Sequence, residues 1–305
     1  MENPCVSMAI TFTLSVFAIY EDDMPLADLE SLNESFGITD HIAFVAGPGG
    51  LPVARIRNAY AAATVSLHGG QALAFQPHGH EPVLWSSTHS QYRPGKAIRG
   101  GIPICWPWFG PHPSDPTKPA HGFARTSLWS VLSTAALADG ATQIRLRLAD
   151  DDTSLALWSH TFDLRLVVTV GAELRAELIA RNPGAAPYTY SGALHSYFNV
   201  SDVAAISIHG LEGCTYIDKV DGEQRKVQRG AVTIEAESDR VYLNTAETCV
   251  IEDSGLDRRI TIARAGSCST VVWNPWAEKA AANQARRHSV GFPSLQAARV
   301  AEAQL

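Results

Sequence analysis

The chain has few cysteines, few charged residues and no apolar run long enough to cross a bilayer. Its 305 residues include only five cysteines, and 18% of the residues are charged. The cysteines are odd in number, widely spaced and without a C-x-x-C pair, which argues against a disulfide scaffold and a cysteine zinc site. A reducing, cytoplasmic location therefore fits the composition best. The five are Cys5, Cys105, Cys214, Cys249 and Cys268.

The chain also lacks an excess of basic residues. Lys and Arg total 24 against 31 Asp and Glu, which gives a formal net charge of −7. A chain with this balance has no overall attraction for a polyanion, so we expect no nucleic-acid partner. With 46% hydrophobic residues, the composition is that of an ordinary globular protein and excludes disordered and fibrous classes.

One apolar stretch near the N-terminus requires separate treatment. Residues 8–20 (MAITFTLSVFAIY) follow Glu2 rather than a basic segment, and EDD comes after them instead of a small-residue cleavage site. The stretch is also too short to span a bilayer, which needs about 20 residues. We therefore expect neither a signal peptide nor a membrane association. Residues 1–23 form an N-terminal extension of undefined role, with Met24 as an alternative start.

Most of the chain alternates apolar and polar residues with a period of two. Residues 163–170 (DLRLVVTV) and 173–181 (ELRAELIAR) place every second, apolar side chain on one face. This pattern is typical of half-buried antiparallel strands. Shorter runs of the same kind occur at 65–67, 72–75, 144–148, 206–208, 259–262 and 270–273.

Turn signals separate these strands, and helices are few. Dipeptides such as Asp139-Gly140 and Asp221-Gly222 punctuate the chain, and helical patterns occur at 26–36, 155–158 and 276–287. Many short strands with regular turns predict an all-β fold, a large antiparallel β-sandwich with few short helices. Because no linker or internal repeat interrupts the pattern, we expect one domain over residues 24–305.

Two segments break the alternation and carry the candidate functional residues. Residues 94–126 form a long irregular stretch rich in Gly, Pro, Trp and His, a kind of loop that is usually functional. From it, Arg99, His121 and Arg125 are candidates to meet His195 at one rim of the sandwich. Arginine suits phosphate or carboxylate, and histidine exchanges protons near pH 7. A structural ion pair for Arg99 and a buried, hydrogen-bonded role for His195 remain the alternatives.

Aromatic residues crowd the same irregular stretch. They are candidates for a stacking wall against the apolar face of a sugar ring, while core packing is the competing interpretation for each residue singly. The five are Trp106, Trp108, Phe109, Phe123 and Trp129.

Other motifs lack the context that their chemistry requires. The glycines at 47–50 and 69–70 do not follow the strand–G-x-G-x-x-G–helix pattern of a nucleotide-binding loop. Residues 77–81 (PHGHE) hold two histidines and a glutamate, but so short a turn cannot easily direct them at one metal ion. We interpret that segment as a solvated loop. No G-x-S-x-G nucleophile motif is present.

Four motifs stand in order along the chain, namely IRGGIPICWPWFG at 98–110, HGFAR at 121–125, HSYF at 195–198 and VVWNPWAEKA at 271–280. Together they resemble the aldose 1-epimerase superfamily and, within it, the D-hexose-6-phosphate mutarotase branch. The resemblance implies a large antiparallel β-sandwich, in agreement with the alternation. It also implies a glucose-6-phosphate 1-epimerase that interconverts the α and β anomers of a hexose 6-phosphate. No metal or cofactor is implied, and we expect a monomer.

The resemblance assigns roles to individual residues. It places the catalytic histidine at His195 and the substrate-binding arginines at Arg99 and Arg125. It further assigns sugar contacts to His121 and to Asp218 of the TYID segment. In the mechanism it implies, His195 protonates the ring oxygen while a general base removes the O1 proton.

The chain departs from the family pattern at the general base. The family has a glutamate in a late F-x-C-x-E pattern, and the best match here is 292–300, which places Gln296 at that position. An amide cannot take a proton at pH 7, and loss of a general base costs about two to four decades of rate. Glu302 is a less favoured substitute because it lies six residues later.

The altered tail leaves alternatives open. The chain ends five residues after Val300, and if final strands were missing, a sheet edge would be left unpaired. A protein without the base would be a sugar-phosphate-binding protein of weakened catalytic power. A third possibility is an epimerase of unphosphorylated aldoses.

Overall fold

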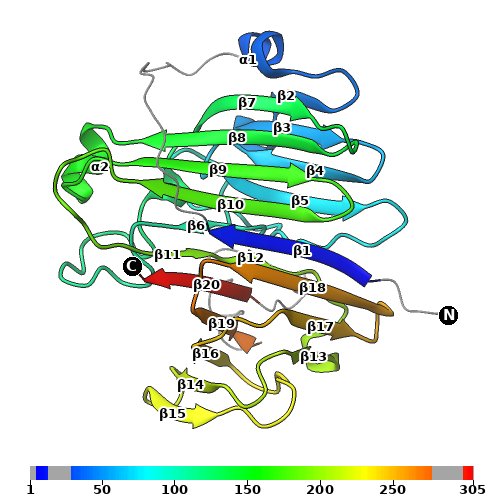
Figure 1. The fold of residues 1–305 in the computed structure, drawn as a ribbon, viewed down its shortest axis with the longest axis vertical. Helices are drawn as coiled ribbons and strands as arrows, with labels where there is room; N and C mark the ends of the chain where they lie inside the picture. Colours follow the sequence, from blue (N-terminus) through cyan, green and yellow to red (C-terminus); the bar gives the residue numbers. More distant parts are fainter. Residues whose placement is uncertain (1–4, 13–28, 277–297, 305) are drawn as a thin grey trace.

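The computed structural model describes residues 5–12, 29–276 and 298–304. These residues form three sheets with few short helices, as the alternation predicts (Figure 1). The first sheet has eight strands in the order β13-β17-β18-β1-β10-β9-β8-β7. Their bounds are Ile206–His209, Cys249–Asp253, Arg258–Ala265, Cys5–Phe12, Leu174–Arg181, Asp163–Val170, Thr142–Ala149 and Ser130–Ala136.

The second sheet carries the His195 segment. Its order is β15-β14-β16-β19-β20-β11-β6, and the two-residue strand β12 (Ser196–Tyr197) also pairs with β20. The bounds of the seven strands are Gln224–Val227, Thr215–Asp218, Ser238–Leu243, Ser269–Asn274, Ala298–Gln304, Ser191–Leu194 and Ile104–Cys105.

A third, four-stranded antiparallel sheet runs β2-β3-β4-β5. Its strands are Ile42–Ala46, Pro52–Arg57, Ala61–Ser66 and Gln71–Pro77, and helix α1 (Leu29–Phe36) packs beside β2. The second α-helix, α2 (Asp152–Leu157), begins at Asp151, whose side chain accepts a hydrogen bond from the Ser154 backbone in a capping box. No helix in the described ranges is long and apolar enough to cross a membrane.

One hydrophobic core joins the three sheets. Strand β8 shows how the sequence builds it, since its buried side chains alternate with more exposed ones along the strand. Leu146 and Val168 of the first sheet, Leu194 of the second and Phe75 of the third all belong to one buried cluster. Burial of large apolar side chains stabilises such a fold by about 1.5–3 kcal/mol for each residue.

Part of the N-terminal extension belongs to the sandwich. Strand β1 lies between β10 and β18 and pairs with both in parallel, as Figure 1 shows in blue. The other pairings of this sheet are antiparallel. The apolar run that superficially suggests a signal peptide therefore begins inside a sheet.

The C-terminal strand fills a gap in the second sheet. Strand β20, drawn in red in Figure 1, pairs antiparallel with β19 on one side and with β11 and β12 on the other. The expectation of an unpaired edge is therefore wrong at this place. The helix expected at 276–287 lies, apart from its first residue, outside the described residues.

Candidate active site

Arg99 immediately precedes a turn in which the next two positions require glycine. Gly100 and Gly101 have φ angles of +117° and +63°, in the left-handed region that favours glycine. A Cβ atom on Gly100 would lie 2.4 Å from the Ser86 Cα, and one on Gly101 would lie 2.1 Å from the Ala72 carbonyl oxygen. The RGG sequence therefore lets this turn press against the third sheet while Arg99 remains exposed.

The HGFAR loop also contains a left-handed backbone and a glycine in close contact with a neighbouring carbonyl group. His121 and Gly122 have φ angles of +66° and +68°, and a Cβ atom on Gly122 would lie 1.9 Å from the Trp106 carbonyl oxygen. A guanidinium nitrogen of Arg125 donates a 2.8 Å hydrogen bond to the Ala120 carbonyl oxygen. These contacts fix His121 and Arg125 on one short loop.

His195 lies at the break between β11 and β12, and its exposed fraction is 9%. Its ring stacks on Tyr197 at a centroid distance of 4.6 Å and an angle of 15°, and Tyr197 in turn stacks on Trp85 at 6.1 Å. The ring of Trp273 lies nearly perpendicular to that of His195, with the two centroids 6.1 Å apart. The buried Nδ1 of His195 has no hydrogen-bond partner among the described residues. The stack therefore fixes the ring plane and leaves a polar nitrogen unpaired.

Four of the predicted residues share one electrostatic environment. Burial, the nearby His121 and the charges of Arg125 and Arg99 lower the pKa of His195 to about 3, although a backbone hydrogen bond opposes the shift. The His121 ring lies 6.3 Å from the His195 ring, and burial with the charge of Arg125 lowers the pKa of His121 to about 4. The structure thus brings together Arg99, His121, Arg125 and His195, which we call the histidine–arginine cluster.

The hydrogen bonds of His121 define its orientation. The backbone N–H of Gly110 donates to its Nδ1 at 3.1 Å. Because Nδ1 accepts, a neutral His121 carries its proton on Nε2. His121 therefore presents a donor, and Arg125 adds a permanent positive charge beside it.

We expect these two histidines to make the fold acid-sensitive. Their pKa values of about 4 and about 3 lie below the ordinary value of 6.5. Between pH 6.5 and 4 the unfolded chain binds protons that the native chain does not, so stability falls as pH falls. The loss reaches at most about 1.4 kcal/mol per pH unit for each histidine. Urea unfolding of the wild type and of His195→Gln between pH 7 and 5 measures this slope.

The matched control for that slope is His209→Gln, which changes an exposed histidine paired with Glu212 and Glu252. The wild type should lose stability faster on acidification than His195→Gln does. Equal slopes for the wild type and His195→Gln would contradict a neutral, buried His195.

The aromatic wall predicted from the irregular stretch is mostly core. Trp106, Trp108, Phe123 and Trp129 have exposed fractions of 5% or less and belong to the main hydrophobic cluster. Only Phe109 remains near the site, with its ring 5.0 Å from that of His121. Tyr197 and Trp273 are the other rings beside the histidine–arginine cluster. The competing interpretation, core packing, is the one that fits four of the five residues.

The structure does not bring Asp218 to this cluster. Asp218 ends β14, which lies four strand spacings, about 19 Å, from β11 across the second sheet. Its carboxylate accepts a 2.8 Å hydrogen bond from the Lys226 ammonium. Burial works to raise the pKa of Asp218, but Lys226 outweighs burial and holds that pKa below its usual range. Asp218 is therefore part of the β14–β15 hairpin.

Sheet register identifies Asp239 as the acidic residue on the correct face. Asp239 of β16 stands directly opposite Trp273 of β19, and opposed residues project from the same face. Trp273 contacts the His195 ring. Asp218 stands opposite Arg240, the neighbour of Asp239, so Asp218 projects from the other face. The sequence analysis did not propose Asp239, because residues 238–243 (SDRVYL) show no alternation that would indicate which face Asp239 occupies.

These positions predict opposite outcomes for two matched substitutions. Asp239→Asn should weaken sugar binding by about tenfold or more, because we expect a carboxylate on the Trp273 face to accept strong hydrogen bonds from sugar hydroxyls. Asp218→Asn should leave kcat and KM within about twofold, since it only removes an ion pair in a distant hairpin. Steady-state kinetics on both variants test this pair. A larger loss in Asp218→Asn than in Asp239→Asn would contradict the register argument.

The predicted base position cannot be placed. Gln296 lies outside the described residues. The backbone of Glu302 lies in β20, opposite Ala193 of β11 and Ser269 of β19. Strand β20 thus passes between the strand that leads to His195 and the strand that carries Trp273.

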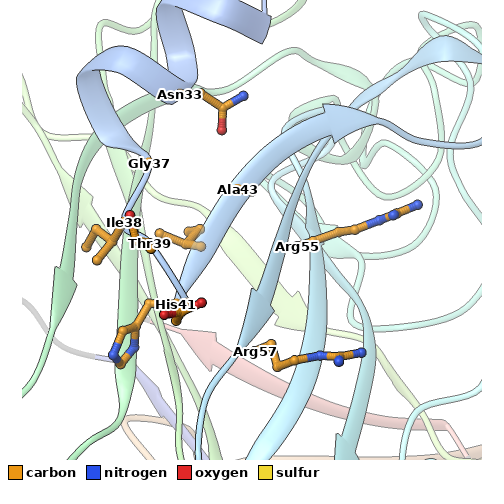
Figure 2. A pocket seen from close by; sticks show the side chains of 10 residues that line it. Asn33, Gly37, Ile38, Thr39, His41, Ala43, Arg55 and Arg57 are labelled. Atoms are coloured by element: carbon orange, nitrogen blue, oxygen red, sulfur yellow. The ribbon is translucent and has the colours of Figure 1, made fainter.

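A separate cavity of about 580 Å³ lies between α1, the following turn and the third sheet. Figure 2 shows Arg55 and Arg57 extending from β3 on the same side of it. The Asn33 amide holds α1 to β2 through hydrogen bonds to both backbone groups of Phe44. No member of the histidine–arginine cluster lines this cavity, so it is distinct from the candidate active site.

No group of three or more metal-ligating side chains occurs in the part of the chain that the structure describes. His78, from the PHGHE loop, uses its Nε2 on the Asn58 carbonyl oxygen at 2.9 Å.

Residues 52–297 match the aldose 1-epimerase family, which is more than half of the chain. The chain belongs to the aldose 1-epimerase family. The matched region contains every residue of the histidine–arginine cluster as well as Gln296, and it ends before Glu302.

Two relatives show where this aldose epimerase lies among known proteins. A provisionally named glucose-6-phosphate 1-epimerase of Escherichia coli is 38% identical over 214 residues, 70% of each chain. Another, from Cenchrus ciliaris, is 35% identical over 249 residues, 78% of this chain and 74% of the relative.

Solved structures agree with the family. A provisionally assigned mutarotase (YeaD) of Salmonella typhimurium superposes with a TM-score of 0.78 and 31% identity, covering 88% of both chains. A galactose mutarotase-like protein of Clostridium acetobutylicum has a TM-score of 0.65 at 13% identity, covering 85% and 87%. The second likeness concerns the fold alone. The epimerase chain is therefore a galactose mutarotase-like β-sandwich.

Proposed function

We propose that this epimerase interconverts the α and β anomers of a hexose 6-phosphate, with glucose 6-phosphate as the representative substrate. The observation that carries the proposal is the position of two arginines beside the buried His195 and the half-buried His121. Arg99 and Arg125 both act on the charge state of His195. The names of the relatives in Escherichia coli and Cenchrus ciliaris support the phosphorylated substrate.

Each group has a distinct task in this proposal. Arg99 and Arg125 bind the phosphate, because a guanidinium donates two parallel hydrogen bonds to two phosphate oxygens. His121 donates from Nε2 to a sugar hydroxyl, and Asp239 accepts from another. Binding at the remote phosphate then holds the anomeric carbon beside His195 and converts binding energy into orientation.

The reaction itself moves two protons. His195 gives a proton to the ring oxygen while a base takes the proton of the O1 hydroxyl, so that the C1–O5 bond breaks and an aldehyde forms. Rotation about C1–C2 presents the other face of the aldehyde, and the reverse transfers close the ring. General acid and general base each contribute about 10²–10⁴-fold to the rate.

The phosphate group of the substrate also raises the pKa of His195, the general acid. Burial and the surrounding positive charges lower the pKa of His195 to about 3, so its ring is neutral at pH 7. A phosphate dianion between Arg99 and Arg125 offsets their positive charge and raises that pKa. Substrate with a phosphate thereby increases the protonated fraction of His195, which a substrate without one does not.

The general base is where this chain departs from the family pattern. Gln296 at the family's glutamate position would leave the chain with slow exchange, because an amide has negligible basicity. This observation favours a second function, a sugar-phosphate-binding protein that keeps the arginines and His195. An epimerase of unphosphorylated aldoses is the third candidate, in which the arginines contact no phosphate.

Anomer exchange with two substrates separates the three functions. We expect the wild type to catalyse exchange of glucose 6-phosphate with a kcat/KM at least about tenfold above that for glucose. Arg125→Ala should reduce kcat/KM for glucose 6-phosphate by at least about tenfold and affect glucose by less than about threefold. Exchange that is indifferent to the phosphate supports the third function and contradicts the proposal.

A further inference from the structure

A buried glutamine lies beneath the turn that carries Arg99. Gln71 is the first residue of β5, and its exposed fraction is 0%. Its amide nitrogen donates to the Gly100 carbonyl oxygen and, at 3.4 Å, to the Ile98 carbonyl oxygen. The two acceptors are the residues on either side of Arg99. One side chain from the third sheet therefore donates to the carbonyl oxygens of both residues that flank Arg99.

We propose that Gln71 is a positioning residue that fixes Arg99 for phosphate binding, and so a determinant of preference for phosphorylated sugars. The inference rests on the proposed function, because it gives Arg99 the task of binding the 6-phosphate. Gln71 acts through Arg99 and does not itself contact substrate.

An amide side chain is required at position 71, because the turn buries two carbonyl oxygens that need a donor. Ile98 packs into a small apolar cluster with Leu51, Val53 and Leu73. An apolar side chain in place of Gln71 would leave two buried carbonyl oxygens without a donor. The other amide atom, Oε1 of Gln71, is buried and has no hydrogen-bond partner in the described part of the chain. The Gln71 amide therefore stabilises the turn through its two N–H donors, while its oxygen has no partner among the described residues.

The opposite side of Arg99 is held by serines. The Ser90 hydroxyl accepts from the Arg99 backbone N–H and donates to the Arg99 carbonyl oxygen, both at 2.9 Å. The Ser87 backbone N–H donates to the same carbonyl oxygen at 3.0 Å. Gln71 holds the turn from within and Ser90 from outside. The backbone of Arg99 is thus fixed on both sides while its side chain remains exposed.

This arrangement limits the freedom of a long side chain. An arginine with a mobile backbone must lose that additional freedom when its guanidinium closes on a phosphate. A fixed backbone removes this part of the cost before substrate arrives. Loss of the Gln71 amide should therefore weaken binding of the phosphate and leave the proton transfers at His195 nearly unchanged.

The test is a double-mutant cycle with inorganic phosphate and glucose 6-phosphate as titrants in calorimetry. Gln71→Met keeps the length of the side chain and removes the amide, and Gln76→Met, at an exposed position on the same strand, is the matched control. We expect Gln71→Met to weaken phosphate binding by about fivefold or more, with kcat within about threefold and a higher KM. In the Arg99→Ala background the same substitution should change phosphate affinity by less than about twofold.

A solely structural role would give a different result. If Gln71→Met weakens binding equally with and without Arg99, or leaves the affinity unchanged, the inference is overturned. If Gln71→Met does not fold, Ser90→Ala replaces it, since it frees Arg99 from outside and leaves the core intact. The double-mutant cycle of Ser90→Ala with Arg99→Ala then tests whether the fixed backbone of Arg99 contributes to phosphate binding.

Different results would contradict the proposed function and the role of Gln71. A wild type that binds phosphate through Arg99 without anomer exchange would contradict the epimerase and still support the role of Gln71. A wild type that binds no phosphate would overturn the role of Gln71.

Discussion

His195→Gln should lower the catalysed anomer exchange of glucose 6-phosphate by about two to four decades. The substitution removes the acid that protonates the ring oxygen, and such a group contributes about 10²–10⁴-fold. Glutamine is close to histidine in size, so the stack on Tyr197 and the surrounding packing should change little. The measurement is the exchange rate between the two anomeric proton signals under saturation transfer.

Binding and chemistry separate in this variant. Glucose 6-phosphate should bind His195→Gln with an affinity within about fivefold of the wild type, because Arg99 and Arg125 remain. His209→Gln, an exposed histidine at the far edge of the first sheet, should retain the wild-type rate. Exchange that survives in His195→Gln would contradict the role of His195 as the acid.

Gln296→Glu should accelerate exchange by at least about tenfold, if Gln296 occupies the base position. An uncharged amide cannot accept the O1 proton, whereas a glutamate can be tuned by its surroundings toward the pH at which it works. Exchange in the wild type should accordingly be slow. Rates for wild type, Gln296→Glu and Gln296→Ala under identical conditions measure the effect.

Glu302→Gln is the companion variant. The backbone of Glu302 stands opposite Ala193 and Ser269 in the second sheet, so this residue belongs to the same sheet as His195. We expect Glu302→Gln to change exchange by less than about threefold, because the family pattern places the base at Gln296. A fast wild type that loses exchange in Glu302→Gln would show that the base is Glu302 and that the placement of Gln296 is wrong.

Local alternation predicted eight of the twenty strands in the described residues. Residues 163–170 place an apolar side chain at every second position, and β9 has these bounds. The strand expected at 173–181 is β10, one residue shorter. Period-two patterning is a local property of the chain, and it persists because one face of each strand is buried.

The terminal strands could not be predicted in the same way. Strand β1 pairs with β10 and β18, which are more than 150 residues away in sequence, and β20 enters between β19 and β11. Pairing between such distant segments leaves no local signal. The parallel pairings of β1 are a further departure from a fold expected to be antiparallel.

The site residues could likewise be predicted only where the sequence carries a local signal. Arg99 and the HGFAR loop were located by the irregular stretch 94–126 and by the family motifs, and the structure shows a left-handed backbone at their glycines. The choice between Asp218 and Asp239 depends on which face of the second sheet each residue occupies, and a shift of one residue reverses the face. Only the pairing of Asp239 with Trp273 decides it.

Saturation transfer between the α and β anomers of glucose 6-phosphate, with and without the wild-type chain, tests the central claim most directly. The account predicts exchange above the uncatalysed rate that disappears when His195 is replaced. It also predicts weaker catalysis for glucose under the same conditions. Binding of glucose 6-phosphate without any added exchange would contradict the epimerase and identify a sugar-phosphate-binding protein.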